Sequence, residues 1–124
     1  MAARIIKGRS LAHMKKLADD ALKARLYVSG WMLSGELLNI RDYLSETSNE
    51  RPLYDIAVAY EDGNAVGVSI INENNNLQVF VRKAKRNNGY GRKLVRKIRR
   101  DGAYGMCGVD GEGKIFTKNG INFH

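Results

Sequence analysis

The chain has 124 residues, of which 44% are hydrophobic and 27% are charged, and it contains 13 glycines and one proline. This composition excludes a disordered tail, a collagen-like chain and a low-complexity segment, and the length suits one ordinary domain. We therefore expect a single folded domain over residues 1–124. One cysteine excludes an internal disulfide, and the two histidines stand too far apart in sequence for a zinc motif.

No targeting or membrane-spanning segment is evident in the sequence. The first ten residues include basic side chains but no apolar run of signal-peptide length, and charged residues interrupt the later hydrophobic stretches. Cys107, without an evident histidine partner, is typical of a buried structural thiol in a reducing compartment rather than of a nucleophile. We expect a cytoplasmic protein that makes no membrane contact.

The positive charge is concentrated in one segment. The formal net charge is +8, yet residues 1–81 carry 9 Lys/Arg against 10 Asp/Glu, and residues 101–124 carry 2 against 3. The whole excess therefore lies in residues 82–100, here called the basic stripe, which holds 10 Lys/Arg and no acid. Such a stripe suits a nucleic-acid backbone, a phosphorylated small molecule or a solvated helix face. Charge alone leaves these three interpretations open.

Two amphipathic helices are predicted in the first half of the chain. Residues 10–26 begin with Ser10, a favourable N-cap, and place apolar side chains at helical spacing. After a turn signal at Ser29-Gly30, Ser34 is the expected N-cap of a second helix. The apolar residues available to that second helix are Leu37, Leu38, Ile40 and Leu44.

From residue 53 the hydrophobic period changes to two, which predicts strands. Residues 53–60 and 65–71 are expected to pair antiparallel across Asp62-Gly63, because Asp-Gly suits the positive dihedrals of a tight hairpin. The elements expected next are a turn at 72–76, a strand at 77–82, a basic loop at 83–88, a helix at 90–100, a strand at 103–109 and a short helix or turn at 113–118.

The loop before the helix at 90–100 carries the strongest functional signal. Gly89 and Gly91 stand where this helix begins. A helix start offers unpaired backbone N–H groups and the positive end of the dipole, and glycine removes the side chains that would keep a phosphate away. The segment therefore predicts an anion-binding site.

Two other phosphate-binding patterns fit the sequence poorly. The dinucleotide fingerprint needs a third glycine where this chain has Leu94, and it needs a βαβ alternation that the predicted elements lack. The segment from Gly108 to Ile115 is similar to a nucleotide-triphosphate loop, but Ile115 replaces the magnesium-binding Ser/Thr and only nine residues follow it. We expect neither pattern to be functional.

The pattern Arg86-x-x-Gly89-x-Gly91, five residues after Val81 and followed by an amphipathic helix, resembles the acetyl-CoA loop of the GNAT superfamily of N-acetyltransferases. The predicted order of elements is similar to that of the family, and residues 109–121 resemble its last strand and helix. The resemblance implies an α+β fold with a mixed, mainly antiparallel sheet flanked by helices. It also implies an enzyme that binds acetyl-CoA and transfers the acetyl group directly to an amine.

The resemblance implies a set of cofactor-binding residues as well. The backbone amides of residues 87–92 would cradle the pyrophosphate, and the exposed edge of residues 79–81 would pair with the pantetheine amides. One N–H near Val81 would polarise the thioester carbonyl. The implied acetyl-CoA residues are Val79, Phe80, Val81, Arg86, Asn87, Asn88, Gly89, Tyr90, Gly91 and Arg92.

Some catalytic positions differ from the family pattern. Thr117 stands where many members place a tyrosine general acid, and a threonine hydroxyl is the weaker proton donor. Asp110 stands where the family commonly has an asparagine that contacts the pantetheine arm. Near the start of the loop strand, where members often place a carboxylate base, this chain has three asparagines and Glu73 as the nearest acid. Glu73 and Thr117 are therefore the candidate base and acid, and no metal is expected.

The resemblance and the charge together define the expected partners. The acceptor is an amine on a protein, an aminoacyl-tRNA or a small molecule, and the net charge of +8 argues against a highly cationic acceptor. The alternative function is a catalytically inactive module of the same fold, whose residues 82–100 bind nucleic acid or an acidic protein. A homodimer that completes the sheet is a further alternative, because the C-terminus is short for the family.

Overall fold

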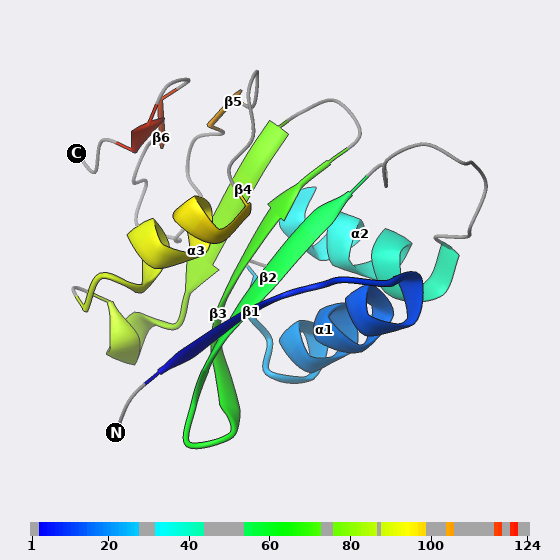
Figure 1. Ribbon diagram of the computed structural model, residues 1–124, viewed down its shortest axis with the longest axis horizontal. Coiled ribbons are helices and arrows are strands. Elements are labelled where there is room, and N and C mark those ends of the chain that lie inside the picture. The colour runs from blue at the N-terminus through cyan, green and yellow to red at the C-terminus, as the bar shows by residue number, and fades with distance from the viewer. Residues whose placement is uncertain are drawn as a thin grey trace.

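A five-stranded sheet forms the centre of the molecule (Figure 1). The computed structural model describes residues 3–27, 32–43, 54–72, 76–86, 88–98, 104–105, 116–117 and 120–121. The strands of the sheet, in spatial order, are β1 (Arg4–Lys7), β2 (Asp55–Glu61), β3 (Asn64–Ile71), β4 (Asn76–Val81) and β5 (Tyr104–Gly105). β1 to β4 pair antiparallel and β5 joins β4 in parallel, which confirms the expected mixed, mainly antiparallel α+β fold.

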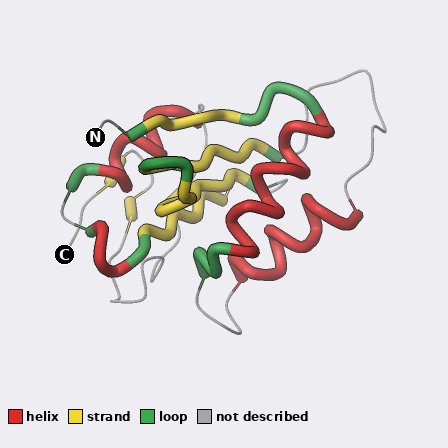
Figure 2. The backbone as a smooth tube through the Cα atoms, turned by 90° about the horizontal axis from the view of Figure 1, so that it is seen from below, coloured by secondary structure: helices red, strands yellow, loops and turns green. Residues whose placement is uncertain are grey.

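Helices cover both faces of this sheet (Figure 2). One face packs against α1 (Leu11–Lys23), α2 (Met32–Leu38) and the π-helical turn η1 (Asn39–Tyr43), and the other packs against α3 (Tyr90–Ile98). None of the helices in the described part of the chain is long and apolar enough to cross a membrane.

The expected N-cap of α1 is confirmed, and that of α2 is wrong. The Ser10 Oγ accepts a hydrogen bond from the His13 N–H at 3.2 Å. α2 already begins at Met32, so Ser34 lies inside its first turn. Leu33 and Leu37 are four residues apart and both buried, and packing this pair against the sheet extends the helix upstream of the serine.

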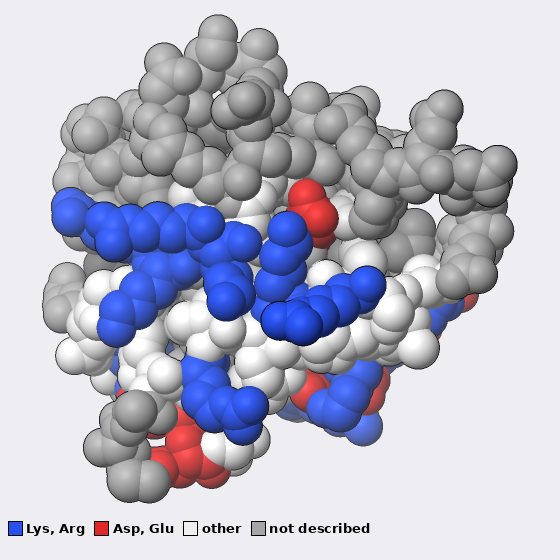
Figure 3. Space-filling model, viewed as in Figure 1, with Lys and Arg blue, Asp and Glu red and all other residues white. Residues whose placement is uncertain are grey.

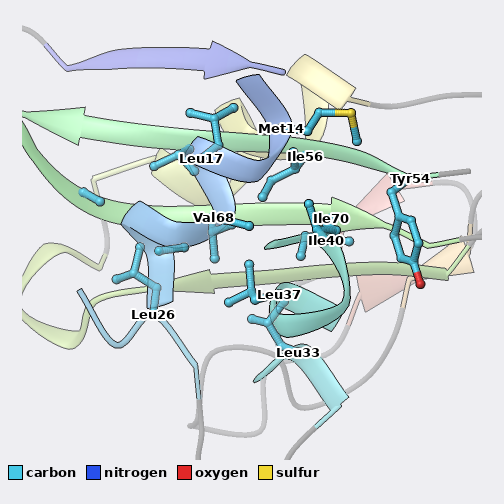
Figure 4. Packing of buried hydrophobic residues seen from close by; sticks show 14 residues of the cluster. Met14, Leu17, Leu26, Leu33, Leu37, Ile40, Tyr54, Ile56, Val68 and Ile70 are labelled. Carbon is cyan, nitrogen blue, oxygen red and sulfur yellow. The ribbon is translucent and has the colours of Figure 1, made fainter. Parts of the chain in front are cut away.

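Alternation along the strands divides the hydrophobic core into two clusters, one on each face of the sheet. Ile56 and Val58 of β2 face α1 and α2, while Ala57 and Ala59 face α3. Figure 4 shows the first cluster, in which side chains of α1 and α2 meet those of β2 and β3. Because successive side chains of a strand point to opposite faces, one sheet buries apolar groups in both directions.

α3 lies close to β3 because β3 has no side chain at Gly67. A Cβ atom at this position would lie 2.9 Å from the Leu94 Cδ1 and 3.3 Å from the carbonyl oxygen of Phe80. Ser69 adds a polar contact, since its Oγ donates to the carbonyl oxygen of Leu94 at 3.0 Å. These contacts fix the height of α3 above the sheet.

The strands and turn expected around the first hairpin are confirmed. Those predicted at 53–60, 65–71 and 77–82 correspond to β2, β3 and β4. The turn has the expected positive φ angles, 53° at Asp62 and 82° at Gly63. The predicted helix at 90–100 is α3, and the predicted strand at 103–109 includes β5.

Two elements differ from the expectation. The sequence does not predict β1, because its two isoleucines are too short a run to show a period of two. Pairing with β2 makes it a strand. The short helix or turn expected at 113–118 is wrong, since β6 (Phe116–Thr117) pairs antiparallel with β7 (Gly120–Ile121). Aromatic and β-branched residues favour this extended backbone.

Truncation of Leu37 tests the core between α2 and the sheet. Leu37 has 0% of its surface exposed, whereas the neighbouring Leu38 is 39% exposed. We expect Leu37→Ala to lower the free energy of unfolding by about 2–5 kcal/mol, because the substitution leaves a cavity. Leu38→Ala should change it by at most about 0.5 kcal/mol. Urea unfolding measures both variants, and equal losses would contradict this assignment of the core.

Candidate functional site

β4 turns one row of its backbone groups away from β3. The Arg82 N–H, directly after the strand, donates to the Val66 carbonyl oxygen at 2.8 Å. This bond fixes the phase of the antiparallel ladder, so that Phe80 directs its backbone groups toward β3. The N–H and C=O groups of Val79 and Val81 therefore point to the opposite edge, here called the open edge of β4.

β5 covers this edge of β4 only at its beginning. Asn76 pairs with Tyr104 and Leu77 pairs with Gly105, and no other described residue pairs with that side of β4. Unpaired backbone groups on a strand edge are a template for amide groups of a ligand or of another chain. Among the described residues, the open edge thus begins directly after Leu77, the partner of Gly105.

The loop after β4 ends at the glycine that starts α3. One turn of 3-10 helix, η2 (Lys83–Lys85), follows the strand. The Asn88 Nδ2 then donates to the carbonyl oxygens of Lys85 at 3.1 Å and Arg86 at 3.4 Å. Gly89 has a φ of +80°, a conformation that other residues rarely adopt. The hydrogen bonds of Asn88 and the positive φ of Gly89 thereby fix the backbone conformation of the loop where it enters α3.

The first turn of α3 leaves backbone N–H groups available at the end of the loop. The Lys93 N–H donates to the Gly89 carbonyl oxygen at 3.2 Å and so begins the helical hydrogen-bond ladder. The N–H groups of Tyr90, Gly91 and Arg92 precede that ladder. The first turn contains no acidic residue, and Arg92 is exposed. Together with the positive end of the helix dipole, these groups suit a phosphate.

Arg86 joins the loop to the open edge of β4. Its Nε donates to the Val81 carbonyl oxygen at 2.9 Å, and its guanidinium carbon lies 5.5 Å from the centre of the Phe80 ring. One acceptor of the open edge is therefore bound by the chain itself. The groups still facing outward are the N–H and C=O of Val79 and the N–H of Val81.

A carboxylate from the β2–β3 hairpin braces both sides of the loop. Glu61 accepts hydrogen bonds from the Lys85 Nζ through Oε1 and from the Tyr90 hydroxyl through Oε2. The bond from Lys85, followed by that from Tyr90, holds the pKa of Glu61 below its usual range. The same contact with Glu61 raises the pKa of Tyr90. Because Lys85 lies in η2 and Tyr90 opens α3, one side chain links the two ends of the loop.

The basic stripe divides into side chains bound by the protein and side chains that face outward. Arg82 Nη2 donates to the carbonyl oxygens of Ala24 at 3.2 Å and Ala65 at 3.3 Å, which joins the end of α1 to β3. Arg82, Lys85 and Arg86 are thus bound within the protein. The other described members of the stripe are exposed, and these are Lys83, Arg92, Lys93, Arg96 and Lys97.

The structure gathers nine of the ten predicted acetyl-CoA residues at the end of β4, the loop and the first turn of α3, and the tenth, Asn87, lies outside the described residues. The backbone of Phe80 pairs with β3, and the buried Tyr90 directs its hydroxyl to the hairpin. Of the candidate acid and base, Glu73 also lies outside the described residues. Thr117 is placed in β6, but its side chain is not among those described.

Two residues of the site region are absent from the sequence-based prediction. Glu61 has the pattern of a hairpin residue, and nothing in the sequence links it to Lys85, 24 positions later. Gln78 is 4% exposed, and its Nε2 has no hydrogen-bond partner among the described residues. The signal for Gln78 is a polar residue inside an apolar strand, which is uncommon at a buried position unless the group is bound.

Replacement of Glu61 by glutamine tests the brace. The lowered pKa of Glu61 means that its stabilising effect is present above the ordinary value of 4.5 and is lost as the pH falls through the lower value in the folded protein. We expect Glu61→Gln to unfold more easily than the wild type at neutral pH, with the difference shrinking in acid. Denaturant unfolding across this pH range measures the effect.

Asp62→Asn is the matched control, because Asp62 is the exposed neighbour and asparagine also tolerates its positive φ. We expect Asp62→Asn to keep the wild-type free energy of unfolding at neutral pH and to show no pH-dependent difference from the wild type. If Glu61→Gln lowered the free energy of unfolding by the same amount at every pH, a role for the ionised carboxylate would be contradicted.

Comparison with known proteins identifies the family. The family model described as the acetyltransferase (GNAT) family matches residues 15–104. A search of curated proteins finds no match. Among solved structures, a ribosomal-protein-alanine N-acetyltransferase from Brucella melitensis biovar Abortus 2308 is similar, with a TM-score of 0.46 and 18% identity over 78% of this chain and 69% of that chain.

A second similar structure is an aminoglycoside acetyltransferase from an uncultured soil metagenomic sample, with a TM-score of 0.43 and 17% identity over 85% of this chain and 77% of that chain. A third is the PaiA N-acetyltransferase from Thermoplasma acidophilum, in complex with coenzyme A. Its TM-score is 0.40, with 13% identity over 78% of this chain and 69% of that chain. The region matched by the family model contains most of α1 and all of α2, β2 to β4, the loop and α3. The chain therefore belongs to the acetyltransferase (GNAT) family.

Proposed function

We propose that this protein is an acetyl-CoA-dependent N-acetyltransferase that transfers the acetyl group directly to an amine. The observation that carries the proposal is the placement of an acid-free helix start beside a strand edge that no described residue pairs beyond Leu77, in a member of the acetyltransferase family. The first feature suits phosphates and the second suits amides. Acetyl-CoA contains both groups, joined in one flexible molecule.

The phosphates of acetyl-CoA match the start of α3. The N–H groups of Tyr90, Gly91 and Arg92 are free of the helical ladder, and the positive φ of Gly89 directs the backbone into this turn. The exposed Arg92 adds a guanidinium for a second phosphate contact. These residues would hold the pyrophosphate without any buried charge on the protein side.

The pantetheine arm matches the open edge of β4. The outward N–H and C=O of Val79 can bind one amide as a neighbouring strand would. Acetyl-CoA, when bound, supplies an activated acetyl thioester. The Val81 N–H, or the Val79 N–H on the same edge, would polarise its carbonyl group, an oxyanion-type contribution that needs no side chain.

The proton transfers are assigned to Glu73 and Thr117. An amine attacks only when neutral, so a base must take a proton from it, directly or through water. Asn72 and Asn76, the described residues on either side of the turn that contains Glu73, lie at the end of β4 where β5 is paired. Thr117 is the candidate donor to the departing thiolate, and its weak acidity predicts a slow enzyme.

The acceptor is an amine on a protein, an aminoacyl-tRNA or a small molecule. A net charge of +8 repels polycationic amines at a distance and favours an acceptor that is neutral or attached to an acidic carrier. A homodimer that completes the sheet is compatible with this proposal.

Gly91→Trp tests acetyl-CoA binding. Gly91 is the second residue of α3, and an indole there would cover the N–H groups that are proposed to hold the pyrophosphate. We expect calorimetry to show at least about a tenfold loss of acetyl-CoA affinity, equivalent to about 1.4 kcal/mol. Absence of acetyl-CoA binding by the wild type at moderate salt would overturn the proposed function.

Gly35→Trp is the matched control. Gly35 is an exposed glycine of α2, and no atom lies within 4 Å of the position that a Cβ would take there, so the same substitution is made in open space on another helix. We expect it to retain wild-type affinity for acetyl-CoA. Equal loss in both variants would show that the indole acts on folding rather than on the pyrophosphate site.

Gln78 is the residue proposed to bind the amine acceptor. It lies on the face of β4 that carries Ile70 in the neighbouring strand, directly between the paired Leu77 and the open Val79. Its unpartnered Nε2 is a donor for an oxygen atom close to the amine of the acceptor. Binding of such a group would satisfy a buried polar atom to which the described part of the chain offers no partner.

Gln78→Leu separates binding from folding. Removing an unpartnered buried amide should leave the free energy of unfolding within about 1 kcal/mol of the wild type. We expect the KM for the amine substrate to rise by about tenfold, the loss of one hydrogen bond, with acetyl-CoA affinity unchanged. Steady-state kinetics and calorimetry measure the two quantities, and an unchanged KM would remove Gln78 from the acceptor site.

A further inference from the structure

The outward face of α3 is uniformly basic. The buried side of this helix consists of Tyr90, Leu94, Val95 and Ile98. Each fully exposed position carries a positive charge, and these positions are Arg92, Lys93, Arg96 and Lys97. At 3.6 residues per turn they span an arc of about 140° with no acid among them.

Solvation alone is a weak explanation for this arrangement, because the solvent-facing side of α1 combines basic and acidic residues in ion pairs. On α1, Lys16 pairs with Asp20 and Lys23 with Asp19, both four residues apart and 2.9 Å between charged atoms. On α3 the corresponding positions repeat the same charge, with Arg96 one turn after Arg92 and Lys97 one turn after Lys93. Like charges at this spacing destabilise a helix. A bound polyanion would remove that repulsion.

β1 extends the basic face beyond the stripe found in the sequence. Lys7 pairs with Ala57, which belongs to the core cluster under α3, so the Lys7 side chain projects on the α3 face. Arg9, just beyond the end of β1, is exposed. Figure 3 shows Lys and Arg side chains gathered over α3 and β1 on one side of the molecule. Residues of β1 and α3, far apart in the sequence, therefore contribute to one surface.

The chemistry of this surface favours phosphates over an acidic protein. Protein interfaces are centred on buried aromatic or aliphatic anchors. Among the described residues, the exposed large hydrophobic side chains are Leu38 and Tyr43, which belong to α2 and η1 on the opposite side of the sheet. A polynucleotide backbone needs no apolar anchor, since its affinity comes mainly from counterion release at Lys and Arg contacts.

This surface is also separate from the proposed acetyl-CoA site. Arg96 and Lys97 lie about 6–8 Å along the helix axis from Arg92, which flanks the first turn. We propose that the face formed by Lys7, Arg96 and Lys97, with their basic neighbours, binds the phosphate backbone of a nucleic acid. This proposal stands independently of acetyl transfer, because the proposed transfer site does not use Lys7, Arg96 or Lys97.

The test is a comparison of two triple variants with the same net charge. Lys7→Gln, Arg96→Gln and Lys97→Gln remove three charges from the proposed face. Lys16→Gln, Lys23→Gln and Arg25→Gln remove three exposed charges from α1 and its end, on the other side of the sheet. Fluorescence anisotropy follows binding of an oligouridylate of about 20 nucleotides, and of a DNA duplex of similar length, as a function of salt.

We expect the wild type to bind with a slope of log affinity against log salt of about −3, as about four phosphate contacts require. The face variant should lose at least about tenfold in affinity at low salt and about two units of this slope, while the α1 variant keeps most of both. Equal weakening of the two variants, failure of the wild type to bind at low salt, or tighter binding of poly-glutamate than of either nucleic acid would overturn the proposal. Circular dichroism confirms that both variants fold.

Discussion

The close contact between α3 and β3 at Gly67 is the constraint on which the candidate site depends. With Leu94 and the Phe80 carbonyl oxygen so near, a side chain at Gly67 would displace the Leu94 side chain and so disturb the packing of α3 on the sheet. The hydrogen bond from Ser69 to the Leu94 carbonyl oxygen holds the same turn of the helix. Because the loop from β4 to α3 is short, lifting the helix would carry its first turn away from the open edge. The phosphate-binding and amide-binding groups are thus aligned by packing further along the helix.

Electrostatic contacts divide the basic residues by function. Arg82 and Arg86 bind backbone carbonyl oxygens, and Lys85 is held by Glu61, so each of these charges shapes the loop. These three charges have partners within the protein, whereas the charges along the outside of α3 face the solvent and can attract an external anion. A stripe that is uniform in sequence therefore contains a part bound within the protein and a part that faces outward, and only the three-dimensional contacts separate them.

The features that depend on neighbours in sequence were predictable, and those that depend on contacts between distant segments were not. The Ser10 cap, the Asp62-Gly63 turn and the glycine loop each act within a few residues, so the residue types predict the local backbone. β1 becomes a strand because β2 offers it a partner, and Glu61 reaches the loop because the hairpin folds beside it. The burial of Gln78 likewise depends on contacts that form only in the folded chain, since a polar residue in a strand can also lie on an exposed face.

One helix thus carries three different interactions on separate surfaces. Its inner side packs on the sheet through Leu94, Val95 and Ile98, its first turn offers N–H groups at the end of β4, and its outer side is basic. The helix is short, so phosphates bound at the first turn and along Arg96 and Lys97 would lie within about one Debye length, roughly 8–10 Å at physiological salt. Two polyanions at that separation repel each other through water, while each is attracted by the same set of cations. The proposed acetyl-CoA and nucleic-acid sites are therefore coupled by charge, without any movement of the fold. Each bound polyanion weakens the binding of the other, and added salt screens this repulsion.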